Sequence, residues 1–98
     1  MLSYITFPPQ GTILARLRRI DRGSTDREPL FVKIAERLDS RTLDSAAFSF
    51  LLIELLHRHV ELVGEDLGSF LPKCILALTG DHELSKAARA AFDELGRG

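Results

Sequence analysis

The chain has 98 residues, a length that suits a single domain. A hydrophobic content of 45% and a charged content of 28% are typical of a globular protein and exclude a disordered one. The net charge of −1 excludes a strong overall attraction to nucleic acid or to an acidic membrane.

No segment predicts export or insertion into a membrane. The start, "MLSYITFPPQ", has no basic residues and is interrupted by two prolines, so it does not resemble a signal peptide. The most apolar run, "AAFSFLLIELL", contains Glu54 and is too short to span a bilayer. Cys74 is the only cysteine, which suits a reducing compartment. We therefore expect a cytoplasmic or nuclear protein without a membrane partner.

The first third of the chain predicts a loose end followed by two helices. Residues 1–9 are expected to be extended or loose; "LSYITF" could form a short strand, but no second alternating segment offers it a partner. Apolar spacing in "QGTILARLRRIDRG" predicts a short helix within 10–22, and "RGSTDRE" a polar loop. The stripe from Leu30 to Leu38 predicts a second helix, with Pro29 in its first turn.

The middle of the chain predicts one long helix over residues 42–63. Ser40 or Thr42 can cap its start, and Gly64 can end it. Its sequence is apolar nearly all round. Such a helix either lies at the centre of the domain or presents a second face to a partner.

Residues 66–97 predict a helical hairpin. "SFLPKCILALTG" forms its first helix, in which Pro72 is tolerable only in the first turn and which Gly80 ends. Asp81 then caps a second helix with one small, Ala-rich face, whose alanines permit close approach to a neighbouring helix. Leu84, Ala88, Ala91 and Leu95 line that face, and Lys86, Arg89, Asp93 and Arg97 line the other.

The chain contains a weak internal repeat. Shifting it by 40 residues places 30–57 over 70–97 without a gap, and Lys33, Ser45 and Glu54 then meet identical residues. The helix and turn signals coincide as well. The domain, residues 10–98, is therefore expected to be all-α, with about five helices in stacked hairpins: a half unit at 10–22, a first hairpin at 29–64 and a second at 66–97.

The second unit, residues 69–96, resembles a repeat of the HEAT/armadillo type. "SFLPKCILALTGD" is similar to the first helix of a HEAT unit, and "DHELSKAARAAFDELG" to the second. The resemblance implies an α-solenoid fragment and a scaffold function. Ser85 stands where HEAT units carry an arginine. A fainter similarity, in "PLF" and "LDSAAFSF", is to the ribosome-binding HEAT scaffold of general amino-acid control. A small helical bundle unrelated to these repeats remains the alternative.

The sequence offers no motif for catalysis. His57 and His59 are about 200° apart on a helix and cannot share a metal ion. Cys74 lies on an apolar stripe, as a core residue does. No phosphate-binding glycine loop, nucleophile elbow or zinc spacing is present. We therefore expect a chain that is not an enzyme and that uses no metal or other cofactor.

Two surfaces are candidates for binding. The first is an apolar partner interface on the long helix, for a protein partner or for self-association. The second is a basic patch on the first helix, which could bind an acidic protein, nucleic acid or the ribosome. Interleaved acidic residues, and the lack of aromatic residues for base stacking, favour a solvated helix face with local ion pairs over a binding role for these arginines. The interface comprises Phe48, Phe50, Leu52, Ile53 and Leu56, and the patch comprises Arg16, Arg18, Arg19 and Arg22.

Overall fold

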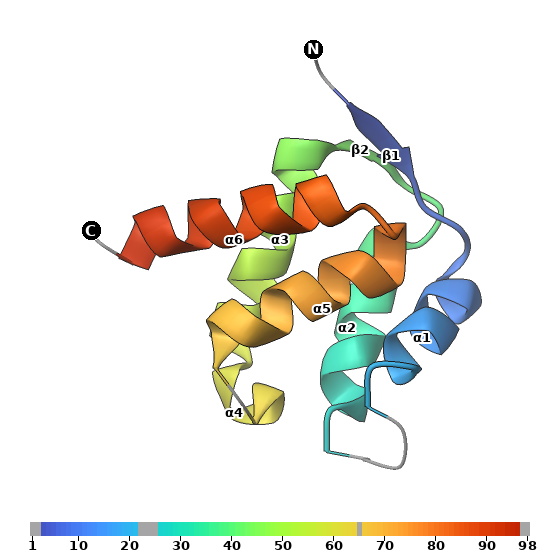
Figure 1. Cartoon of the computed structure of the whole chain (residues 1–98). Helices are drawn as coiled ribbons and strands as arrows, with labels where there is room; N and C mark the ends of the chain where they lie inside the picture. The colour runs from blue at the N-terminus through green and yellow to red at the C-terminus, as the bar shows by residue number, and fades with distance from the viewer. Residues whose placement is uncertain (1–2, 22–25, 65, 97–98) are drawn as a thin grey trace.

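Helices account for most of the computed structural model, which describes residues 3–21, 26–64 and 66–96 (Figure 1). The expected all-α class is confirmed for this part of the chain, with a two-stranded sheet added to it. The helices are α1 (Gln10–Arg18), α2 (Glu28–Leu38), α3 (Ser45–Arg58), α4 (Val60–Val63), α5 (Leu67–Thr79) and α6 (His82–Gly96), and the strands are β1 (Tyr4–Thr6) and β2 (Thr42–Asp44).

The two strands join the start of the chain to its middle. They pair antiparallel, with Ile5 opposite Leu43. Just beyond them, the Phe7 amide donates to the Arg41 carbonyl at 2.8 Å, and the buried Phe7 ring lies 5.0 Å from that of Phe48. Of the extended or loose conformation expected for residues 1–9, Tyr4–Thr6 take the extended one, whereas the expectation that this strand lacks a partner was wrong. Three-residue strands are too short to show an alternating pattern, and their pairing is non-local.

The long helix expected over 42–63 is divided in the structure. The sheet takes up 42–44, so the helix starts at Ser45, and the Asp44 carboxylate accepts from the Ala47 amide at 2.7 Å. Asp44 is therefore the cap, rather than Ser40 or Thr42. The helix stops before His59, whose φ of −121° and ψ of 37° interrupt it. The short α4 then ends at Gly64, which has a φ of 73°.

Helix α5 contains a proline in its interior. Asp66 caps the helix, so Pro72 is its sixth residue and does not lie in the first turn as expected. A proline has no N–H, which leaves the carbonyl of Gly68 without its helical partner. Arg89 of α6 supplies the missing donor, because its Nη1 bonds to that carbonyl at 2.5 Å. Arg89 therefore reaches across to α5, although the sequence placed it on the polar face of α6.

Helix α5 lies in the middle of the fold and touches α1, α3, α4 and α6 (Figure 1). The most extensive helix pairs are α1 with α2 and α5 with α6, whereas α2 and α3 touch over a shorter length. At the shift of 40 residues, α2 corresponds to α5 and α3 corresponds to α6. The stacking of these units as a solenoid stays a prediction. The largest fully buried side chains are Phe31, Phe48, Phe70, Ile13, Leu17, Leu30, Ile34, Leu38, Leu52, Leu56, Leu71 and Ile75.

Candidate functional site

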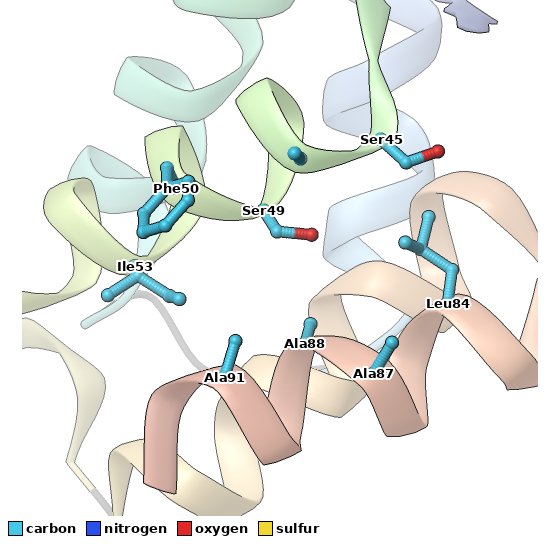
Figure 2. Close-up of a pocket in the computed structure, with 9 residues that line it drawn as sticks. Ser45, Ser49, Phe50, Ile53, Leu84, Ala87, Ala88 and Ala91 are labelled. Atoms are coloured by element: carbon cyan, nitrogen blue, oxygen red, sulfur yellow. The ribbon is translucent and has the colours of Figure 1, made fainter. Parts of the chain in front are cut away.

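An apolar groove runs between α3 and α6 and encloses about 280 Å³. Side chains of the two helices point toward each other across it, with Ser45 and Leu84 at one end and Ile53 and Ala91 at the other (Figure 2). Most of its lining residues are apolar and none is charged. The α3–α6 groove is lined by Ser45, Ala46, Ser49, Phe50, Ile53, Leu84, Ala87, Ala88 and Ala91.

The groove stays open because α6 is held mainly by α5. The Ser85 hydroxyl donates to the Pro72 carbonyl at 3.4 Å, and Arg89 bonds to the Gly68 carbonyl. These contacts fix one side of α6 and turn its alanines toward α3. The Ala-rich face expected to allow close helix contact does touch α3, with Ala88 buried, and it also lines the hollow.

The five residues of the expected partner interface do not share one surface. Phe48, Leu52 and Leu56 are in the core, where α3 packs against the rest of the domain. Ile53 is buried at the base of the α3–α6 groove, and Phe50 is 57% exposed on its rim. Successive residues of a helix are about 100° apart, so one side of α3 is covered and another is open.

The residues that complete the groove were not among the sequence candidates. They are Ser45, Ala46 and Ser49 from α3 and Leu84, Ala87, Ala88 and Ala91 from α6. Small residues carry little signal of binding on their own. The run of alanines in α6 was the available signal, and it predicted close packing of helices instead.

A second, more polar hollow lies on the other side of Phe50. It begins against Phe50, Leu51 and Glu54 and continues between α2 and α3 to a basic end. Two of its basic residues, Lys33 and Arg37, have no hydrogen-bonded or ion-paired side-chain partner among the described residues. The basic end of this α2–α3 crevice is lined by Lys33, Glu36, Arg37, Leu55, Arg58 and His59.

The arginines of the expected basic patch are not gathered for one ligand. Arg16 donates to the Leu78 carbonyl at 3.2 Å, and Arg18 forms an ion pair with Glu28. The hydrogen bond between them raises the pKa of Arg18 and lowers the pKa of Glu28. Arg19 is exposed at the end of α1, and Arg22 lies outside the described residues.

The histidines and the cysteine singled out in the sequence contribute to packing or lie at a helix end. The His57 ring stacks on Phe92, with centroids 5.7 Å apart, and His59 stands at the break between α3 and α4. Cys74 is buried within α5. Among the described residues, no three His, Cys, Asp or Glu side chains form a group that could hold a metal ion.

The helices of the described residues are too short or too polar to cross a membrane. Comparisons with protein-family models, with curated proteins and with solved structures found no match to this chain.

Proposed function

We propose that this chain is a non-catalytic protein–protein interaction module and that the α3–α6 groove is its binding surface. The observation that carries the proposal is the open apolar groove with Phe50 on its rim. Continuous apolar surface of this kind marks interaction sites in globular proteins, because its exposure to water is unfavourable.

The lining of the groove favours a polypeptide ligand that inserts apolar side chains. The groove contains no charged side chain for acid–base chemistry or for binding an anion. Its small residues, Ala87 and Ala91, leave room between two helices for a side chain of a third element. A helix-in-groove contact works in this way, with apolar anchors spaced along one face of the bound helix.

The construction of the module from HEAT-like repeats is part of the same proposal. The correspondence of α2 with α5 and of α3 with α6 at one common shift supports it. The shorter contact between α2 and α3 is less favourable to a simple stack of hairpins.

A nucleic-acid or ribosome-associated function through the first helix is the competing proposal. It has less support, because Arg16 is bonded to a carbonyl of α5 and Arg18 to Glu28. Its distinguishing property would be a steep loss of affinity with added salt.

The proposal is tested by placing a photo-crosslinking amino acid in the groove of the intact chain, in cells that make it. We expect the probe at Ala87 to crosslink to a polypeptide, and a matched probe at Ala15, exposed on α1, to give no such product. The crosslinked polypeptide is then purified and its affinity measured. Phe50→Asp should weaken that affinity at least about tenfold. Equal crosslinking from both positions, or none from Ala87, would overturn the proposal.

A further inference from the structure

The surface around the α3–α6 groove has opposite charges on its two edges. Glu83 and Glu94 lie four residues before and seven residues after Ala87, so all three are on the same side of α6. The two glutamates form the outer edge of the surface on this helix. Lys33 and Arg37 lie on the opposite edge, in the α2–α3 crevice. An acidic edge, an apolar centre and a basic edge thus follow one another across α6, α3 and α2.

Nearby charges on both edges reduce this contrast. On the acidic edge, Lys86 lies 3.9 Å from Glu83, and both side chains are highly exposed, so the pair is weak. On the basic edge, Glu54 is paired with Arg58 at 2.9 Å. Glu36 is the remaining carboxylate of the crevice, against Lys33, Arg37 and the half-buried His59.

The centre of the surface combines a projection with a hollow. Phe50 stands exposed beside the groove, and the groove has the alanines of α6 on its far side. An aromatic side chain from another molecule could enter this hollow without displacing a large residue. Phe50 of a second copy is such a side chain.

We propose that the occupant of the groove is a second copy of this chain, bound face to face in a twofold-symmetric dimer. The inference rests on the proposed function and deepens it. A twofold axis that passes between Phe50 and the groove brings Phe50 of each copy to the groove of the other. The same rotation places the acidic edge of each α6 against the partner's basic α2–α3 edge. Both contacts are made twice, as in any isologous interface.

The size of the surface indicates a weak dimer. Helices of 14 and 15 residues are about 21–22 Å long, and packed helices lie about 10 Å apart. A face that spans α6, α3 and the edge of α2 covers roughly 600 Å² per copy, or about 1,200 Å² in total. This area is at the lower limit of specific interfaces, so a dissociation constant in the micromolar range is expected.

The first test is light scattering and sedimentation of the intact chain over a hundredfold range of concentration at low salt. We expect the mass to rise from that of one chain to that of two. Phe50→Asp should weaken association at least about tenfold, whereas Ala15→Glu, on α1, should leave it unchanged. Circular dichroism and denaturation confirm that each variant is folded. A monomer at every concentration would overturn the proposal, as would a dimer that Phe50→Asp does not affect.

A charge-exchange experiment tests the symmetry itself. The double variant Lys33→Glu/Arg37→Glu and the double variant Glu83→Lys/Glu94→Lys should each dimerise several-fold more weakly, because like charges then face each other. In a mixture, both edges become complementary again, so the heterodimer should recover an affinity near that of the unaltered chain. Failure of the mixture to associate would overturn the face-to-face arrangement.

The outcomes separate this inference from the proposed function. If the chain stays monomeric while Ala87 crosslinks to a different protein, the groove is a binding surface and self-association is wrong. If neither association nor crosslinking is found, both proposals fail.

Discussion

Helices α5 and α6 are neighbours in sequence and in space, but they are covered to very different extents. Helix α5 lies against helices on several sides, and Phe70, Leu71 and Ile75 are among its buried residues. Helix α6 is longer, yet only Ser85 and Ala88 are buried. Figure 1 shows α6 at the edge of the fold, extending away from the centre toward the C-terminus. The comparison indicates that α5 contributes more to the stability of the fold than α6, which leaves apolar surface exposed.

The largest expected effect contrasts two phenylalanines. The ring of Phe70 is fully buried, stacked 6.5 Å from Phe31 and covered by the Arg27 guanidinium 4.7 Å above it. Phe70→Ala should lower the free energy of unfolding by about 3–5 kcal/mol, because it leaves a cavity in the core. Phe50→Ala should change it by less than about 0.5 kcal/mol. Urea denaturation of dilute protein measures both.

An equal loss in the free energy of unfolding for Phe70→Ala and Phe50→Ala would contradict the division between a covered helix and an open face. Leu95→Ala is the matched control on α6, since Leu95 is also exposed and its truncation should have little effect.

A smaller effect is expected at the contact that joins the two helices. Arg89→Ala removes the donor to the Gly68 carbonyl, which Pro72 leaves without a helical partner. An unsatisfied carbonyl should cost about 1–2 kcal/mol in the free energy of unfolding. Lys86→Ala, an exposed change on the same helix, should cost less than about 0.5 kcal/mol. Denaturation midpoints of the two variants give the comparison.

A double-mutant cycle tests the contact between Arg89 and Gly68 directly. A Cβ at position 68 would lie 3.2 Å from Cζ of Arg89, so Gly68→Ala requires that side chain to shift by a few tenths of an ångström in the unaltered protein. Once Arg89 is alanine, the conflict disappears, and the substitution should gain the usual advantage of alanine in a helix, about 0.5–1 kcal/mol. Additive effects of the two changes would show that Arg89 does not depend on Gly68.

The smallest effect is expected at the exposed ion pair of Arg18 and Glu28. Because the hydrogen bond to Arg18 lowers the pKa of Glu28, this pair stabilises the fold above the ordinary glutamate pKa of about 4.3. The contribution should decrease as the pH falls from there through the lower pKa of the folded state. Stability curves of the protein and of Glu28→Gln should therefore differ slightly at pH 7 and converge in acid. A difference that grows in acid would contradict this assignment.

The ends of the helices were predictable where one local signal decides them. Gly64 and Gly80 end helices with left-handed φ values of 73° and 70°, as their lack of a side chain allows. The Asp81 carboxylate caps α6 by accepting from the Leu84 amide at 3.0 Å. Pro72 was placed wrongly because the donor that compensates for it comes from another helix. The break at His59 likewise has no local proline or glycine to announce it.

The candidate site was only partly predictable. The apolar sequence of α3 indicated that some of its residues could face a partner, but it could not show which side α6 would cover. That depends on Arg89 and Ser85, which fix α6 to carbonyls of α5. Tertiary contacts of this kind are not encoded in the periodicity of either helix.

The pairing of β1 with β2 has a consequence for synthesis of the chain. Tyr4 cannot pair until its partner Asp44, 40 positions later in the chain, has been synthesised. At a synthesis rate of about 5–20 residues per second, this takes roughly 2–8 s. During that time β1 is an unpaired strand that other nascent chains could join. Its length of three residues and its exposed Thr6 limit what such a contact could gain. The shortness of β1, which prevents its prediction from sequence patterns, therefore also limits its association with other chains before β2 is synthesised.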